Sequence, residues 1–257
     1  MNNTSVETIG CFKTILDPYN GLTIDQVSLP DSKQEFEINL DYLIEECEYK
    51  RNLVWIYIDI KRSDFIPIAI KRGFNFHSCE ENYVLIVKRL IKNAIIPTAA
   101  NHTLGVGAVV IHENKLLVIK ERVSNLGFKL PGGHIDNSEM ISTALVREVK
   151  EETGIDVEFE SIISLGHFYP HQFHKSNLYI LCIAKAKSFE INIEDTAEII
   201  EAKWMDIDKY LEDENVLAYS KAVVIAAIEY KGFTRANHQT LTHINKDFEL
   251  FFPKEIK

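Results

Sequence analysis

The stretch GHIDNSEMISTALVREVKEETGI, residues 133–155, decides the fold of this protein. Its second part predicts a helix over 139–153, closed by a glycine in the left-handed conformation. Glu148, Glu151 and Glu152 stand at positions i, i+3 and i+4, so their carboxylates emerge on one side of that helix. Like charges at this spacing cost about 0.2–0.5 kcal/mol per pair, so the arrangement requires a cation nearby.

The residues around these glutamates favour a site for a hard divalent cation. Mg²⁺ and Mn²⁺ bind oxygen ligands and bridge to phosphate oxygens, which would offset the repulsion. Arg147 and Glu139 lie about two turns apart on a similar side of the helix, so an ion pair between them would orient the carboxylates. The preceding turn, Pro131-Gly132-Gly133, lets the backbone approach a metal or a phosphate without interference from Cβ atoms. Turn and helix are predicted to form one site.

Taken alone, a glutamate-rich run on a helix is more often a solvated face than a metal site. Here, however, nine positions follow a longer fixed pattern. The pattern is Gly133, five residues, Glu139, seven residues, Arg147-Glu148, Val149, one residue, Glu151-Glu152, one residue, Gly154 and Ile155. It resembles the signature of the Nudix hydrolase family at every position and without gaps, and chance is a poor explanation for such a match.

This resemblance implies an α/β fold, the Nudix α/β/α sandwich with a mixed sheet. The signature of the family forms a loop, helix and loop that hold Mg²⁺ or Mn²⁺. Carried over by position, the resemblance makes Glu148, Glu151 and Glu152 the metal ligands, with the backbone carbonyl of Gly132 or Gly133 as a helper. By the same resemblance Arg147 and Glu139 support these ligands. The reaction implied is attack of water on a phosphorus of a diphosphate, assisted by the metal.

The general base is less well defined, because in the family it is either a signature glutamate or an acidic residue from a later loop. The segment EINIEDTAEIIEAKW, residues 190–204, supplies four candidates. They are Glu194, Asp195, Glu198 and Glu201. Glu198 is favoured because it stands six residues before Trp204, a placement similar to later-loop carboxylates of the family. The alternative for each candidate is an exposed loop charge.

Apolar periodicity predicts further elements on both sides of the signature. Before it we expect a helix over 31–50, a strand over 53–60, a short helix ended by Gly73, and strands over 74–78 and 82–90. Around and after it we expect a hairpin joined at residues 113–115, strands over 157–166, 176–186 and 201–207, and helices over 207–214 and 218–232. Residues 92–103 contain Pro97 and small polar residues without a clear period, which indicates a domain boundary.

The segment before that boundary carries a second resemblance. A strand with a tryptophan, a helix and the run Gly73-Phe74-Asn75-Phe76-His77-Ser78-Cys79-Glu80 are similar to the pre-Nudix domain of one subgroup. That subgroup includes plant ADP-ribose/NADH pyrophosphatases and the human protein encoded antisense to a fibroblast growth factor. We therefore expect a pre-Nudix domain over 1–95, a Nudix domain over 103–235 and a C-terminal extension over 236–257. The subgroup implies a homodimer, whereas His77 by itself is more often an interfacial strand residue.

The substrate is less sharply indicated than the reaction. Pro170, fifteen residues after Ile155, resembles a proline of ADP-ribose hydrolases, whereas the adjacent Tyr169 resembles a tyrosine of diadenosine-polyphosphate hydrolases. Arg122 and Lys129 are similar to phosphate-contacting residues of the subgroup. The alternative interpretation of both residues is ordinary surface charge. We expect cleavage of ADP-ribose or NADH with release of AMP. The alternatives are a dinucleoside-polyphosphate or RNA-cap hydrolase and a nucleotide-sensing regulatory module.

Composition limits the partners of the protein. The 257-residue chain carries a formal net charge of −10, which argues against a role that depends on a broad basic surface for duplex nucleic acid. An acidic site that acts on phosphates also needs bound divalent cations, because its own field repels the substrate. The four cysteines show no CxxC spacing, which favours a reduced, cytoplasmic setting. The first residues resemble no export leader, and no apolar run approaches the roughly 18 residues that span a bilayer, so no membrane partner is expected.

Overall fold

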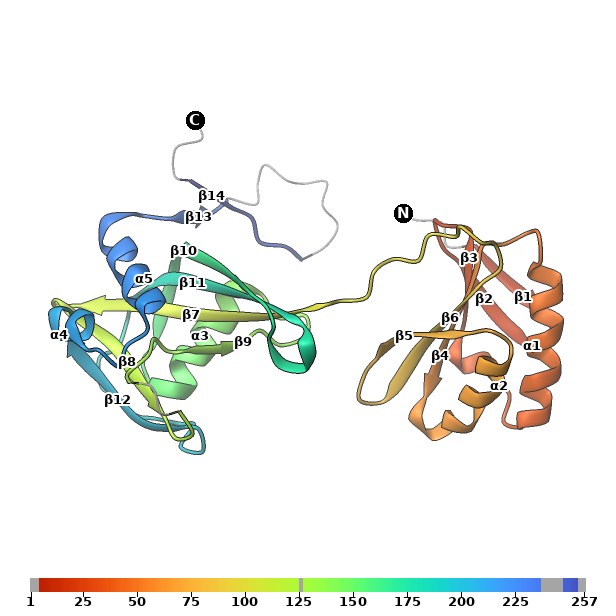
Figure 1. Cartoon of the computed structure of the whole chain (residues 1–257), viewed down its shortest axis with the longest axis horizontal. Helices are drawn as coiled ribbons and strands as arrows, with labels where there is room; N and C mark the ends of the chain where they lie inside the picture. The colour runs from red at the N-terminus through yellow and green to blue at the C-terminus, as the bar shows by residue number, and fades with distance from the viewer. Residues whose placement is uncertain (1–4, 125–126, 237–246, 254–257) are drawn as a thin grey trace. The chain divides into compact units, whose positions relative to one another are not determined.

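The computed structural model describes residues 5–124, 127–236 and 247–253 and contains two separate sheets (Figure 1). The chain divides into two units, Met1–Ala100 and Asn101–Lys257, each with its own core. Much of the expected C-terminal extension, namely 237–246 and 254–257, lies outside the described residues, as do residues 1–4 of the N-terminus. In the part of the chain that is described, no helix combines the length and the apolar character needed to cross a membrane.

The first unit is built on a mixed six-stranded sheet. Its strand order is β1 (Val6–Ile9), β2 (Phe12–Leu16), β3 (Gly21–Ile24), β4 (Leu53–Asp59), β6 (Tyr83–Arg89) and β5 (Asn75–Cys79). β3 and β4 are parallel, and the other neighbouring strands are antiparallel. The predicted element order, which began with a helix, was incomplete, because three strands precede that helix. These strands have four or five residues each, too few for a clear alternation in the sequence.

The helices of this unit lie on one face of its sheet. Helix α1 (Lys33–Cys47) begins after Ser32, whose hydroxyl accepts a hydrogen bond from the backbone N–H of Glu35 at 3.1 Å. The 3₁₀ segment η2 (Ile60–Phe65) continues into α2 (Ile66–Lys71). The Phe36 ring of α1 stacks on Phe65 with a centroid distance of 4.3 Å, which joins the helices over the buried strand residues. The opposite face carries a smaller cluster around Trp55.

The second unit is also built on a mixed sheet, and it carries the signature. The strand order is β12 (Ile199–Asp206), β8 (Lys115–Glu121), β7 (His102–His112), β11 (Ser176–Ala186), β10 (Val157–Phe168), β13 (Phe233–Arg235) and β14 (Phe251–Pro253), and β9 (Gly132–His134) also pairs with β7. β7 and β11 are parallel, and the other pairs are antiparallel. β14 belongs to the expected C-terminal extension, so the end of the described chain returns to this sheet.

Helices cover both faces of the second sheet, which makes the α/β/α sandwich. Helix α3 (Ile141–Thr153) packs on one face, and α4 (Ile207–Glu212) and α5 (Ala218–Glu229) pack on the other (Figure 1). Side chains of β7 alternate between the two cores, since Val106 and Ala108 contact the α3 side and Val109 the α4 and α5 side. The fold class expected from the signature is confirmed.

Candidate active site

Helix α3 holds the signature residues and starts two residues later than predicted. Met140 is its N-cap residue, with extended backbone (φ −85°, ψ 151°), so Glu139 belongs to the preceding turn and not to the helix. At the other end Gly154 adopts φ +75°, and its N–H donates to the Lys150 carbonyl at 2.7 Å. A Cβ at Gly154 would lie 2.3 Å from the carbonyl oxygen of Asn192, so the closing position has no room for a side chain.

One guanidinium, that of Arg147, orients the carboxylates of the turn and the helix. It donates to Glu139 from Nε at 2.9 Å and from Nη2 at 2.8 Å. Its Nη1 donates to Glu148 at 2.8 Å and to Glu151 at 3.2 Å, and Nη2 also reaches the carbonyl oxygen of His134 at 3.0 Å. The hydrogen bonds from Arg147 lower the pKa of Glu139, which therefore stays ionised. The expected pair of Glu139 and Arg147 is present in the structure.

The third glutamate of the helix face, Glu152, lies in the interior. Its side chain points to the turn before the helix, where its Oε2 accepts a hydrogen bond from the Gly132 N–H at 2.6 Å. The pKa of Glu152 is raised to about 8, mainly by burial and to a smaller extent by the charges of Glu148 and Glu198, against the lowering effects of the Gly132 N–H and Lys129. Burial also raises the pKa of Glu148. A cation close to both carboxylates would favour their ionised forms.

The glycine turn approaches the glutamates closely. A Cβ at Gly133 would lie 2.6 Å from Oε2 of Glu148, so only glycine leaves that carboxylate in place. Gly132 has φ +147°, and a Cβ there would lie 2.2 Å from the carbonyl oxygen of Val106. The two glycines therefore have different functions: Gly132 fits the turn against β7, and Gly133 makes room for Glu148.

The chemistry of these groups suits Mg²⁺ or Mn²⁺, because carboxylate and carbonyl oxygens are the ligands that hard cations prefer. Glu148, Glu151 and Glu152 are the carboxylates in question. Within the described ranges, no three or more His, Cys, Asp or Glu side chains are grouped so that they could hold a metal ion. Glu148 and Glu151 are instead hydrogen-bonded to Arg147, so metal binding would replace part of that network.

Glu198 lies in the loop between β11 and β12, near the signature. Its side chain is exposed, and its charge contributes to the raised pKa of Glu152. Arg122, expected to contact phosphate, holds this loop: its Nη2 donates to the Thr196 carbonyl at 2.8 Å and its Nε to the Ala197 carbonyl at 3.2 Å. The backbone N–H of Arg122 also donates to the Glu198 carbonyl at 2.8 Å. Arg122 thereby supports the loop that presents Glu198.

A cavity of about 290 Å³ adjoins the glutamates. Lys129 and Tyr179 connect the two, since both line the cavity and both interact electrostatically with Glu152. Lys129 also forms an ion pair with Glu121. The other lining residues are Gly127, Phe128, Leu130, Phe168, His171, Asn177, Leu181, Asn215, Leu217, Tyr219 and Ser220. Aromatic rings with a few polar groups are a suitable lining for a nucleoside.

Tyr169 and Pro170 were expected to contact the substrate. They stand between the cavity residues Phe168 and His171 in the sequence, but neither of them lines the cavity. Tyr169 is 69% exposed, whereas its neighbours Phe168 and His171 face the cavity. Of the residues predicted to contact substrate, Lys129 is the one that reaches the cavity wall.

Tyr179 is a residue of the site that sequence reasoning missed. Its ring lies over two glycines of β7, because a Cβ at Gly105 would be 2.5 Å from its Cδ2 and a Cβ at Gly107 would be 2.9 Å from its hydroxyl oxygen. Burial, followed by the charges of Glu152 and Glu148, raises the pKa of Tyr179. The signal in the sequence was the run Gly105-Val106-Gly107, since glycines inside a strand mark the close approach of another group.

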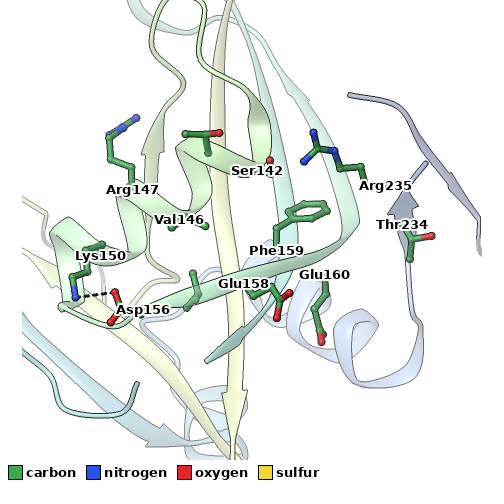
Figure 2. Close-up of a pocket in the computed structure, with 12 residues that line it drawn as sticks. Ser142, Val146, Arg147, Lys150, Asp156, Glu158, Phe159, Glu160, Thr234 and Arg235 are labelled. Atoms are coloured by element: carbon green, nitrogen blue, oxygen red, sulfur yellow. Dashed lines mark ion pairs between the residues drawn. The ribbon is translucent and has the colours of Figure 1, made fainter. Parts of the chain in front are cut away.

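A larger groove of about 840 Å³ lies on the outer side of α3 (Figure 2). Its walls come from α3, from β10 and from β13. The residues labelled in Figure 2 are Ser142, Val146, Arg147, Lys150, Asp156, Glu158, Phe159, Glu160, Thr234 and Arg235. Lys150 and Asp156 form an ion pair of 2.9 Å at one end of the groove.

Two family descriptions match the chain: "NUDIX domain" over residues 101–224 and "Nudix hydrolase domain" over residues 12–90. Nudix hydrolase 8 of Arabidopsis thaliana is 36% identical over 205 residues, 76% of this chain and 55% of that protein. Nudix hydrolase 2 of Arabidopsis thaliana is 34% identical over 194 residues, 70% of this chain and 69% of that protein. Nucleoside diphosphate-linked moiety X motif 6 of Homo sapiens is 37% identical over 180 residues, 67% of this chain and 56% of that protein. The chain thus spans little more than half the length of two of these relatives.

Proposed function

This chain belongs to the Nudix hydrolase family, and on that premise we propose that it hydrolyses the diphosphate linkage of a nucleoside diphosphate derivative. ADP-ribose and NADH are the first candidates, with AMP as a product. The observation that carries the proposal is the position of Glu148 and Glu152 next to a cavity of nucleoside size. Lys129 and Tyr179 connect the glutamates to the cavity, because both residues line it and both interact with Glu152.

Glu148, Glu151 and Glu152 would hold Mg²⁺ or Mn²⁺. When bound, such an ion neutralises phosphate charge and lowers the pKa of a water molecule. The pair of Glu139 and Arg147 holds the carboxylates in orientation through its hydrogen bonds. Together these residues form the part of the proposed site that binds the metal ion.

The remaining groups act on the substrate and on the attacking water. Lys129, on the cavity wall, supplies a positive charge to a diphosphate oxygen. Glu198, exposed on its loop and close enough to influence Glu152, accepts the proton of the attacking water. The rings of Phe168, His171 and Tyr219 enclose the nucleoside.

The preference for ADP-ribose or NADH rests on two features. Pro170 matches the proline position of ADP-ribose hydrolases, and the cavity is near the lower end of the roughly 300–1,000 Å³ usual for small-ligand sites. A cavity of this size encloses one nucleoside better than two, which favours ADP-ribose, with its single nucleoside, over compounds that contain two, such as NADH or a diadenosine polyphosphate. We also propose a homodimer, as the first-unit resemblance implies, which sedimentation of the full chain would test.

The test is a product-resolved screen of the full chain with Mg²⁺ or Mn²⁺ in ¹⁸O-labelled water. The substrates are ADP-ribose, NADH, a diadenosine polyphosphate and a capped RNA, and the products are identified by mass spectrometry. We expect AMP from ADP-ribose or NADH, with one labelled oxygen in one of the two products. Preferential cleavage of the other two substrates would overturn the substrate assignment. Tight nucleotide binding without any product would overturn hydrolysis in favour of a regulatory module.

A further inference from the structure

Helix α3, which presents the glutamates, begins without a cap of its own. Met140 forms no side-chain hydrogen bond to the first turn among the described residues, and that turn contains no acidic residue. The first N–H groups of a helix have no partner within it and carry the positive end of the helix dipole. An acceptor for this end comes either from water or from a side chain elsewhere in the chain.

That acceptor is Glu249, which stands 107 residues after Ser142. The backbone N–H of Ser142 lies 3.4 Å from Oε1 and 3.3 Å from Oε2 of Glu249, and the Ser142 hydroxyl donates to Oε1. Arg235 Nη1 lies 3.6 Å from the same carboxylate, and the Glu249 side chain is only 2% exposed. A buried carboxylate thus lies at the positive end of α3, where its charge is favourable.

Glu249 is held in place by contacts that do not involve α3. β14 pairs with β13, and β13 pairs with β10, so residues 251–253, which begin two residues after Glu249, are fastened to the sheet (Figure 1). The Ala236 N–H donates to the Leu250 carbonyl at 2.7 Å, and the rings of Phe251 and Phe159 are 5.4 Å apart. In Figure 2 the groove separates Ser142 on α3 from Thr234 and Arg235 on the β13 side. Glu249 connects those two walls.

We propose that Glu249 is a positioning residue for the reaction, because it fixes the start of the helix that carries the metal-binding face. Ser142 lies five residues before Arg147, about one and a half turns along the helix. Glu139, the partner of Arg147, lies outside the helix on the preceding turn. A loosened first turn would therefore disturb the alignment of Arg147 with Glu139, and with it Glu148 and Glu151. This inference rests on the proposed function for its catalytic part.

The test compares Glu249→Ala, Glu249→Gln and Ser142→Ala with the wild type. Asp247→Ala is the matched control, since Asp247 is an exposed acid two residues away on the same segment. Three readouts are needed at a temperature where circular dichroism shows each variant folded. They are hydrogen exchange at the start of α3, the kcat and KM for the substrate found in the screen, and the Mg²⁺ concentration that gives half-maximal rate.

For Glu249→Ala we expect faster exchange at the start of α3, a kcat lower by about 10-fold, a higher Mg²⁺ requirement and little change in KM. Glu249→Gln keeps an acceptor for Ser142 and should recover part of the loss, whereas Asp247→Ala should match the wild type. A lower melting temperature with unchanged kcat and unchanged exchange would overturn the proposal and leave a structural role only. If Glu249→Ala does not fold, Glu249→Gln and Ser142→Ala decide the same comparison.

Failure of this inference is distinguishable from failure of the proposed function. If the wild type hydrolyses no substrate in the screen, the proposed function fails and the catalytic part falls with it. The exchange measurement still decides whether Glu249 caps α3, because it requires no turnover.

Discussion

The guanidinium of Arg147 donates two hydrogen bonds to the Glu139 carboxylate, from Nε at 2.9 Å and from Nη2 at 2.8 Å. Because Glu139 precedes α3 and Arg147 lies within it, this pair fastens the glycine turn to the helix. The remaining nitrogen, Nη1, contacts Glu148 and Glu151. One side chain thus orients three carboxylates, and its planar shape is what allows it to do so.

Replacing Arg147 by lysine should lower kcat by about 10- to 100-fold with little change in KM. A lysine keeps the charge, but its ammonium cannot bind Glu139 through two parallel hydrogen bonds and reach Glu148 as well. Steady-state kinetics with the substrate found in the screen would measure the effect. Lys150→Ala is the control on the same helix, and equal rates for the two variants would contradict the role given to Arg147.

Gly133→Ala should reduce activity more than stability. The added Cβ would meet the end of the Glu148 side chain at 2.6 Å, and that flexible group can move aside at small cost to the fold. Movement of Glu148 would take a carboxylate away from the metal-binding face. We expect a kcat at least about 10-fold lower and a nearly unchanged melting temperature.

Gly132→Ala should cost more stability than Gly133→Ala and serves as the comparison for it. Here the Cβ would meet the Val106 carbonyl oxygen at 2.2 Å, and φ +147° is unfavourable for alanine. We expect a loss of stability of about 1–3 kcal/mol, measured by denaturant unfolding. If both glycine variants had the same stability, the distinction drawn between the two positions would be wrong.

Glu152→Gln should abolish turnover while the fold survives. The amide oxygen of glutamine still accepts the hydrogen bond from the Gly132 N–H, and removal of a charge from a buried position has no stability cost of its own. The neutral amide, however, is a weaker ligand for a divalent cation than a carboxylate, so the proposed metal site is weakened. We expect a rate at least about 100-fold lower with an equal or higher melting temperature. A rate close to that of the wild type would remove Glu152 from the proposed metal site.

Asp41 of the first unit should contribute stability that depends on pH. Arg72 donates to its carboxylate from Nη2 at 2.8 Å, and this hydrogen bond lowers the pKa of Asp41. A carboxyl group whose pKa is lowered by folding adds stability above its unfolded pKa, and that stability is lost as pH falls through the folded value. The wild type should therefore be more stable than Asp41→Asn near neutral pH, by a small amount because the side chain is half exposed.

The advantage over Asp41→Asn should begin to decline below roughly pH 4 and should be gone once the pH falls below the lowered pKa of Asp41 in the folded protein, where both side chains are uncharged. Thermal unfolding across the pH range measures it. The same comparison can be made in an Arg72→Gln background, where the hydrogen bond that lowers the pKa of Asp41 is gone. There the difference in stability between the chain with Asp41 and the Asp41→Asn variant should depend much less on pH. A constant difference at all pH values would contradict the assignment of this pair.

The sequence by itself determined the features that arise from neighbouring residues. Helical geometry places Glu148, Glu151 and Glu152 on one side wherever the helix lies, so the acidic face followed from spacing alone. The closing Gly154 and the pairing of Arg147 with Glu139 are also local, since eight residues separate the partners of that pair. These interactions form within a few turns of chain, and their pattern is therefore visible in the residues.

Tertiary structure decided the features that join distant segments. The short strands β1 to β3 exist because neighbouring strands supply hydrogen bonds and burial that four or five residues cannot provide alone. Tyr179 enters the site only because β11 lies beside the glycines of β7. Glu249 reaches the start of α3 across 107 residues, because β13 and β14 carry the chain back to the sheet. Such contacts depend on how the sheet brings strands together, and a local pattern such as the glycines of β7 does not identify the residue that makes the contact.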